Sequence, residues 1–319
     1  MKKITNLEYQ SLMFLLSFPL FMGIGISKMI NCVGSDIWIS MLIGTLIGVF
    51  IIFILKKIPD KNSKLCSLII NSIFILLGTL IFNKLVGSIY LSKTPNFIIM
   101  IPGYSLLIYT VFKGRDTLFK TSSILLIIFI ILFFLAAFVL LPTINFDYFM
   151  PIGTSKISNI FSSSIDMALL STTPFVLLPK CKEKISYKTY LVACLTIYVI
   201  IMCTLGNLGV DIAKIYRYPE YMVFKKISLL KSIENIENVL FMIWIITIYN
   251  ITALASINIK EEFNYKVLFI VYSIIVFISV KYLISSYKTT SFLLNYFTYI
   301  LLGILVICII DRIIKKRFK

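Results

Sequence analysis

Long apolar stretches separated by short polar or charged segments run along the whole chain. A bilayer core of about 30 Å requires about 20 largely apolar residues in each membrane-spanning helix. The sequence contains ten stretches of this kind, at approximately 10–30, 36–55, 66–91, 96–113, 119–141, 162–180, 189–210, 238–258, 266–285 and 291–311. The pattern predicts an all-α, polytopic membrane protein of about ten transmembrane helices, with residues 1–319 in a single integral membrane domain.

The composition agrees with this prediction. Of the 319 residues, 59% are hydrophobic and 14% are charged, whereas an ordinary soluble domain has about 45–50% apolar and about 25% charged residues. The mean hydropathy is +0.98. These values exclude a water-soluble globular protein and a disordered chain.

The excess of positive charge predicts an orientation in the membrane. There are 31 Lys and Arg residues against 14 Asp and Glu, a net charge of +17. In a soluble protein this surplus would indicate nucleic acid, but cytoplasmic loops of membrane proteins are rich in Lys and Arg. If the N-terminus is cytoplasmic, the segments on that side hold 20 of the 31 cations, and five of the other 11 lie in one outer loop, 211–237. We therefore expect a multi-pass cell-membrane protein with both termini cytoplasmic and no nucleic-acid partner.

Residue types needed for enzyme chemistry are scarce. The chain has no histidine, and its six cysteines form no CxxC pair. Histidine-based acid–base, nucleophilic and metal chemistry is therefore excluded, and zinc or redox motifs are not indicated. We expect no metal, no cofactor and no enzymatic activity.

Ten spans divide into two sets of five, at about 8–141 and 162–311. An odd number of spans per half inverts the second half relative to the first. Such inverted repeats place the substrate site near the midplane, at discontinuous helices that correspond in the two halves. The sequence therefore predicts a 5+5 inverted repeat in which spans 1 and 6 are broken.

The expected breaks contain helix-breaking and small residues at mid-depth. Span 1 carries Gly23 and Gly25, followed by Ser27. Span 6 carries Ser171, Thr172 and Thr173 before a proline. We expect these residues to bind a ligand; the alternative is that they only kink the helices, since Gly and Pro are frequent in membrane helices.

Four ionisable residues lie inside or at the rim of predicted spans: Lys28, Lys84, Asp166 and Lys281. A charge at a helix centre costs about 2.5–3.5 kcal/mol on insertion scales, so it normally faces a cavity or a partner. Lys28 and Lys281 are near enough to helix ends to extend toward the interface. Lys84 and Asp166 lie deeper, and either pair with each other or meet the opposite charge of a ligand.

Span 8 carries polar side chains at mid-depth, including Tyr249 and Asn250. One interpretation is that they line a polar cavity as ligand-binding residues. The other is that they form hydrogen bonds between helices.

The loop 211–237 is the longest segment between spans. After Pro219, the apolar residues Val223, Ile227 and Leu230 recur at helical spacing. This pattern predicts an amphipathic helix at the outer membrane face. Such a helix would cap an outer vestibule, dock a partner or simply pack in the interface.

Several segments resemble one family. Residues 4–26, ITNLEYQSLMFLLSFPLFMGIGI, resemble the opening of the B subunits of spore germination receptors, the GerAB type, which belong to the amino acid–polyamine–organocation transporter superfamily. Further matching segments follow in the same order: GSDIWISMLIGTLIGV at 34–49, SKTPNFII at 92–99, FKGRDTLFK at 112–120, and YPEYMVFKKISLLKSIENIENVLFMIW at 218–244.

The resemblance implies a subunit that senses a small nutrient, an amino acid, with a transporter-like fold. Such subunits work with an A-type subunit and a C-type lipoprotein subunit in the inner spore membrane. The ligand would lie between spans 1, 3, 6 and 8, with its carboxylate on the N–H groups around Gly23 and Gly25, as anions bind at helix ends. Ser171, Thr172 and Thr173 would add hydrogen bonds.

Two other functions remain open at this stage. A secondary amino-acid permease would use the same fold and site for uptake. A structural scaffold subunit of a membrane complex would bind no ligand, and its polar mid-membrane residues would serve only helix packing.

Overall fold

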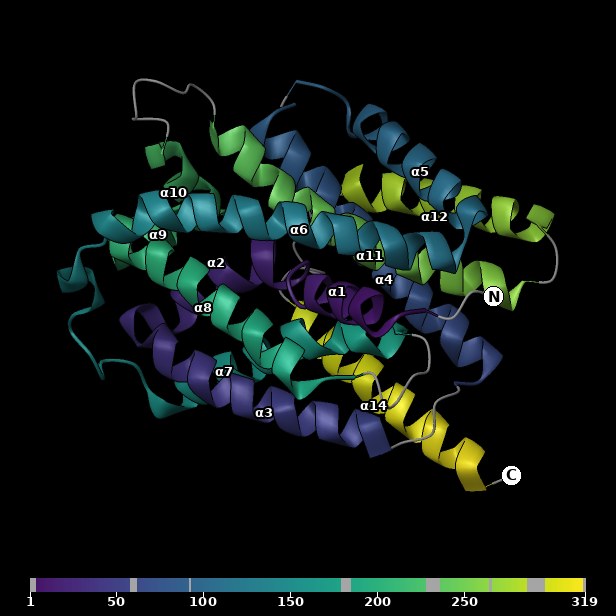
Figure 1. The fold of residues 1–319 in the computed structure, drawn as a ribbon, viewed down its shortest axis with the longest axis horizontal. Helices are drawn as coiled ribbons and strands as arrows, with labels where there is room; N and C mark the ends of the chain where they lie inside the picture. Colours follow the sequence, from purple (N-terminus) through teal and green to yellow (C-terminus); the bar gives the residue numbers. More distant parts are fainter. Residues whose placement is uncertain are drawn as a thin grey trace.

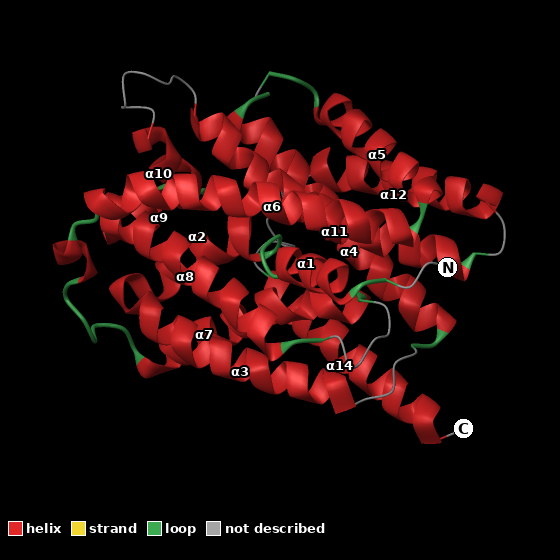
Figure 2. Ribbon diagram, viewed as in Figure 1, coloured by secondary structure: helices red, strands yellow, loops and turns green. Residues whose placement is uncertain are grey.

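The fold consists of helices that run mostly along one common direction (Figure 1). The computed structural model describes residues 4–57, 62–91, 93–178, 185–227, 236–263, 266–285 and 296–317. Within these ranges every regular element is a helix, as Figure 2 shows. The predicted all-α, polytopic class is thus confirmed.

Each of the ten predicted stretches corresponds to a helix or to a pair of helical pieces. They are α1 (Asn6–Leu16) with η1 (Phe21–Gly25) and α2 (Ile26–Val33), α3 (Ile37–Lys57), α4 (Lys64–Ile89), α5 (Asn96–Lys113), α6 (Arg115–Leu140), α7 (Ile157–Thr172) with η5 (Thr173–Leu177), α8 (Tyr187–Leu208), α11 (Ile236–Glu262), α12 (Lys266–Ser285) and α14 (Phe297–Arg317). Short elements connect them at one end of the bundle: η2 (Gly34–Asp36), η3 (Leu141–Thr143), η4 (Phe146–Phe149), α9 (Val210–Ile215) and α10 (Pro219–Ile227).

The helices account for ten crossings. Eight described segments are long and apolar enough to span a membrane, and the first of them, Asn6–Lys57, has 52 residues. Because about 20 residues suffice for one crossing and the chain turns at Gly34 (φ 53°), this segment supplies two. Helix α12, with the apolar stretch Ile270–Leu283, supplies the tenth. The start of α1 and the end of α14 lie at the same end of the bundle, as an even number requires (Figure 1).

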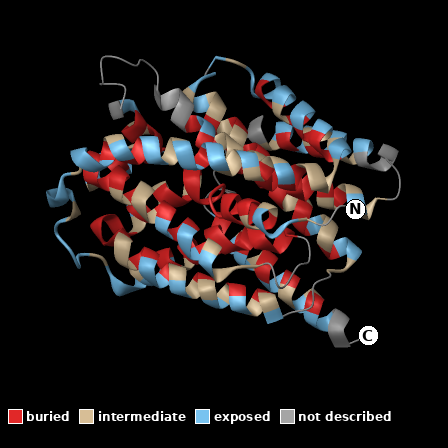
Figure 3. Ribbon diagram, in the orientation of Figure 1, coloured by how far each residue is buried: buried red, intermediate tan, exposed pale blue. Residues whose placement is uncertain are grey.

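Helix α1 lies in the middle of the bundle. It begins with a capping box, in which the Glu8 N–H donates to the Thr5 hydroxyl and the Thr5 N–H donates to the Glu8 carboxylate. From Ser11 to Leu16 every residue is buried, so its second half is enclosed on all sides, as expected for a helix that is apolar all round. Figure 3 shows this buried centre.

Large apolar side chains cover the outside of the bundle. Leu46 and Phe50 of α3 and Phe134 and Phe138 of α6 are all exposed, on helices whose outer faces are largely exposed in Figure 3. Patches of this kind are rare on soluble monomers. They are the surface that a lipid bilayer covers.

Two glycines let α3 approach α7 and α8 closely. Gly44 and Gly48 are spaced as in the GxxxG pattern of packed membrane helices. A Cβ at Gly44 would lie 2.7 Å from both the Met167 Cβ and the Ser164 carbonyl oxygen, and a Cβ at Gly48 would overlap the Tyr190 hydroxyl. The close contact holds span 2 against span 6, where one of the two breaks occurs.

We expect Gly44→Leu to lower the thermal unfolding temperature of the detergent-purified protein. The leucine has to displace backbone of α7, and overpacking of this kind costs about 1–3 kcal/mol. Gly303→Leu is the matched control, because no atom lies within 4 Å of a Cβ at Gly303 and glycine is a poor helix former. Equal unfolding temperatures for the two variants would contradict this account of the α3–α7 contact.

Candidate functional site

Spans 1 and 6 are interrupted where the sequence predicts. In span 1 the helical path is lost at Met22 (ψ 124°) and Gly23 (φ 103°) and resumes in α2. In span 6, α7 ends at Thr172 and continues as the tighter helix η5, with Pro174 in its first turn. The break in span 1 frees main-chain N–H and C=O groups from their helical partners.

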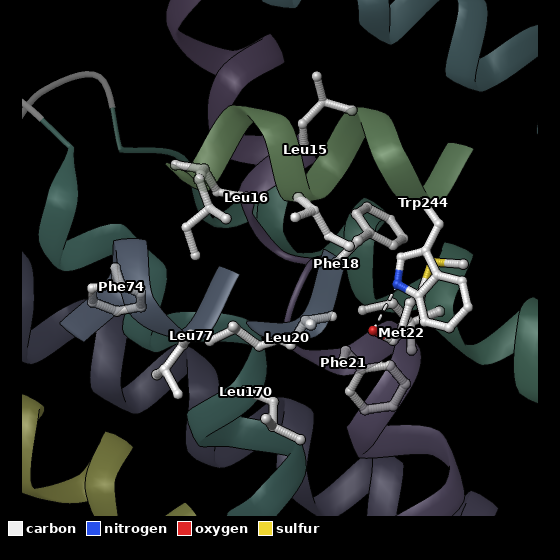
Figure 4. Packing of buried hydrophobic residues seen from close by; sticks show 14 of the residues in the cluster. Leu15, Leu16, Phe18, Leu20, Phe21, Met22, Phe74, Leu77, Leu170 and Trp244 are labelled. Atoms are coloured by element: carbon white, nitrogen blue, oxygen red, sulfur yellow. Dashed lines mark hydrogen bonds between the residues drawn. The ribbon is translucent and has the colours of Figure 1, made fainter. Parts of the chain in front are cut away.

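Side chains from much later in the chain bind both polar ends of the Met22–Gly23 peptide group. The Gly23 N–H donates to Glu220 Oε1 at 3.0 Å. The Trp244 Nε1–H donates to the Met22 carbonyl oxygen at 2.7 Å, the contact drawn in Figure 4. The Trp244 ring also lies directly against the Gly23 Cα, so that any Cβ there would overlap it. Glycine is therefore required at position 23, both for its positive φ and for the space.

Glu220 is a buried carboxyl group in largely apolar surroundings. It is only 1% exposed, and Oε2 has no hydrogen-bond partner among the described residues. It borders a cavity of about 20 Å³, large enough for one water molecule. The other lining residues are Met22, Phe133, Ala136, Ala137, Leu140, Val199, Ile200, Cys203, Thr204, Val223, Phe224 and Ile243. Burial raises the pKa of Glu220 to about 7, and the Gly23 N–H offsets only part of that rise.

A larger polar cavity lies at the end of the bundle that the charge distribution predicts to be outside. Its volume is about 760 Å³, and its walls carry both acidic and basic residues, Asp147, Lys156, Asp211 and Lys214. It reaches the C-terminal end of α2 at Val33. The eight residues of α2 separate it from the span-1 break by about 12 Å at 1.5 Å per residue. We call this cavity the outer vestibule.

The predicted small and hydroxyl residues serve mainly packing and helix geometry. A Cβ at Gly25 would lie 2.7 Å from Leu170 Cδ1 of α7, so spans 1 and 6 do meet at their breaks. The hydroxyls of Ser171, Thr172 and Thr173 donate to carbonyl oxygens one turn earlier in α7. Ser27 is half-buried in α2, and its carbonyl oxygen accepts a hydrogen bond from Asn31.

Asp166 pairs with Lys28, and the predicted pair with Lys84 is wrong. Lys28 Nζ lies 2.8 Å from Asp166 Oδ2 and also donates to the Thr298 hydroxyl. The prediction that Lys28 of α2 extends to the interface is therefore wrong, because its ammonium group pairs with the buried Asp166 carboxylate of α7. Lys84 is half-buried in α4 and forms no ion pair with any described residue. Lys281 is exposed, with Nζ 5.6 Å from the centre of the Phe97 ring.

Tyr249 and Asn250 bind neighbouring helices away from the break. The Tyr249 hydroxyl lies 2.7 Å from that of Thr110 on α5, and Asn250 Oδ1 accepts from the Ser122 hydroxyl on α6 at 2.8 Å. Both therefore form bonds between helices. Tyr249 also borders a separate, mostly apolar cavity of about 220 Å³ between α4, α5 and α11.

Sequence reasoning missed Glu220 and Trp244. The predicted amphipathic helix exists as α10, but it packs into the bundle, with Val223 and Phe224 buried; its predicted continuation through Leu230 lies outside the described residues. Glu220 precedes Val223 by three residues and Ile227 by seven, which places it on the apolar face of α10. An acidic residue on the apolar face of a predicted loop helix was the feature of the sequence that could have identified Glu220 as a candidate site residue.

These features define a class: a polytopic, permease-like membrane protein with a discontinuous first span. A family profile described as spore germination protein, the spore permease family, matches residues 63–292. The match covers more than two thirds of the chain, and the chain belongs to this family. No curated protein matches it. The matched range includes Glu220 and Trp244.

Removing one partner of the Lys28–Asp166 pair should destabilise the fold. Lys28→Met leaves Asp166, whose side chain is 6% exposed, without its counter-charge. We expect a loss of about 2 kcal/mol, below the about 3–5 kcal/mol typical of fully buried pairs because Lys28 is one-third exposed. Lys281→Met is the control, since Lys281 has no acidic partner among the described residues. If both variants unfold at the same temperature in detergent, the pair makes no net contribution.

The buried carboxyl group predicts a pH-dependent stability. A carboxyl whose pKa is raised by folding stabilises the fold fully below its unfolded pKa of about 4.5, and this stabilisation is lost as pH rises through about 7. Burial raises the pKa of Tyr218, the titratable neighbour whose charge Glu220 affects, so this phenol stays neutral over this range. The unfolding temperature of the wild type should therefore fall between about pH 5 and about pH 8 by more than that of Glu220→Gln. Parallel profiles would show that Glu220 does not titrate in this window.

Proposed function

We propose that this chain is the nutrient-sensing B-type subunit of a spore germinant receptor of the GerAB type. Its transporter-like fold would be that of the amino acid–polyamine–organocation superfamily, and its ligand a small nutrient, namely an amino acid. It would act with A-type and C-type lipoprotein subunits in the inner spore membrane. Membership in the spore germination protein family supports the germination role.

The observation that carries the amino-acid site is the carboxyl group already bound at the span-1 break. Glu220 Oε1 accepts the Gly23 N–H in a buried environment. Main-chain N–H groups at an interrupted helix can donate hydrogen bonds to carboxylates. The Gly23 N–H already donates one to a carboxyl group, that of Glu220. The carboxylate of an amino acid would take this place, and the ligand would arrive through the outer vestibule.

Sensing requires two arrangements of the bundle that bind the ligand unequally. A ligand shifts such an equilibrium only by its difference in affinity for the two states. The broken spans 1 and 6 meet at Gly25 and Leu170, so a ligand at the break contacts both halves of the fold. Partner subunits would detect the resulting change at the surface of the bundle.

At the end of the bundle where α14 ends, hydrogen bonds of α11 connect the last residues of span 6 to α6. Asn258 Nδ2 donates to the Leu177 carbonyl oxygen at 2.8 Å, and Arg115 Nη2 donates to Asn258 Oδ1 at 2.8 Å and to Glu261 at 2.6 Å. A permease has to open this end in every cycle, whereas a sensor does not. The flux measurement below therefore separates the two functions.

The test is amino-acid binding by the purified full chain. We expect at least one of the twenty standard amino acids to raise its unfolding temperature, and Gly25→Leu to abolish the shift, because the larger side chain meets Leu170 and Phe21. Gly303→Leu, in open space on α14, should leave the shift unchanged. A full shift in Gly25→Leu would refute this site.

Flux separates the sensor from the permease. The chain reconstituted alone in liposomes should bind the labelled amino acid without accumulating it. Accumulation against a proton or sodium gradient would favour the permease. If no amino acid binds and no substitution near Gly23 affects germination, the chain is a scaffold subunit.

A further inference from the structure

The carboxyl group at the span-1 break belongs to the protein itself. Glu220 occupies the position in which the proposed function places the carboxylate of the ligand, since both require the Gly23 N–H. One N–H group cannot give a full hydrogen bond to both. Binding of the ligand and docking of Glu220 therefore exclude each other.

Packing alone does not explain a glutamate at this position. The cavity beside Glu220 is lined mostly by apolar side chains of α6, α8 and α10, and an aliphatic residue would fill it without leaving Oε2 unpaired. A buried polar group that lacks one of its partners costs free energy. The contact with another described residue that Glu220 makes and an aliphatic side chain does not is the hydrogen bond to Gly23.

A movement of α10 can bring this carboxylate to two cations. Lys84 of α4 and Arg217, three residues before Glu220, are near enough for their positive charges to repel each other. Neither forms an ion pair with a described residue. Helix α10 already borders this end of α4, where the rings of Tyr221 and Tyr90 meet edge to face with centres 6.2 Å apart. A carboxylate released from Gly23 would reduce the repulsion between Lys84 and Arg217.

We propose that Glu220 is an internal competitor that selects ligands bearing a carboxylate: the ligand takes the Gly23 N–H, and Glu220 moves with α10 toward Lys84 and Arg217. The inference rests on the proposed amino-acid site. It adds a reason for selecting ligands with a carboxylate and a conformational change that follows binding. Binding of the ligand at mid-depth releases Glu220 and so causes α10 to move at the outer face. It also gives a role to Lys84 of α4, which forms no ion pair with another described residue.

The mechanism predicts opposite effects for substitutions at its two positions. Glu220→Ala removes the competitor and should tighten amino-acid binding by about fivefold, the equivalent of one modest hydrogen bond. Lys84→Gln removes one of the two cations that attract the released Glu220 and so favours the state in which Glu220 binds Gly23. This variant should bind the amino acid several-fold more weakly than the wild type. Lys93→Gln, an exposed cation in the loop after α4, is the matched control and should bind as the wild type does. Glu220→Gln keeps an oxygen acceptor for Gly23 but no charge for Lys84, and should bind more weakly than Glu220→Ala.

Dissociation constants are measured by equilibrium binding of the amino acid that gives the largest thermal shift, on the full chain in nanodiscs, with its carboxamide as the second probe. The carboxamide should bind poorly to every variant. Equal constants for the wild type, Glu220→Ala and Lys84→Gln overturn the competitor role while leaving the amino-acid site intact. Weaker binding by Glu220→Ala makes Glu220 a direct ligand contact and also overturns it. Failure of every amino acid to bind the wild type, Glu220→Ala and Glu220→Gln alike refutes the amino-acid site itself.

Discussion

The hydrogen bond between the Gly23 N–H and Glu220 is the interaction on which the centre of the fold depends. A helix interrupted inside a membrane exposes peptide groups that cost several kcal/mol each if they are left unpaired. Glu220 binds the N–H at the break, and Trp244 binds the neighbouring Met22 carbonyl oxygen. The Met22–Gly23 peptide group therefore requires hydrogen-bond partners, which α10 and α11 supply in this structure. This requirement explains why a loop helix is buried between membrane spans.

The same interaction joins the two halves of the chain. Gly23 lies in the first half, and Glu220 and Trp244 lie in the second. The Lys28–Asp166 pair and the contact of Gly25 with Leu170 bring spans 1 and 6 together on the other side of the break. A change in the backbone at Gly23 therefore alters the contacts of span 1 with α7, α10 and α11. This arrangement is suited to a protein that converts the presence of a small ligand into a change of shape.

The architecture could be predicted from the sequence because the bilayer imposes a simple rule on helix length and polarity. All ten predicted spans correspond to helices, and the glycines of span 1 mark the break, since Gly23 adopts a positive φ. The partners could not be predicted in the same way. Asp166 pairs with Lys28 rather than Lys84 because helix packing, which a linear pattern does not contain, decides which charges meet. Glu220 was hidden in a segment whose amphipathic pattern resembled a surface helix.

The hydroxyl groups show a second limit of prediction. Ser171, Thr172 and Thr173 have the composition of a binding segment, but their hydroxyls bond to carbonyl oxygens of their own helix. In an apolar environment this local bond is always within reach, so hydroxyl content alone does not identify a site. A buried carboxyl group with an unpaired oxygen is more informative, and among the described residues Glu220 has one.

The most direct test of the central claim is the distance between α10 and the start of α7 with and without ligand. Spin labels at the exposed positions Lys225 and Ser158, in a chain whose six native cysteines are replaced, report it by pulsed electron resonance. The account predicts that a bound amino acid shifts the distance distribution in the wild type, and that Glu220→Ala shows the shifted distribution without ligand. A single distribution under all these conditions, with the amino acid demonstrably bound, would contradict it.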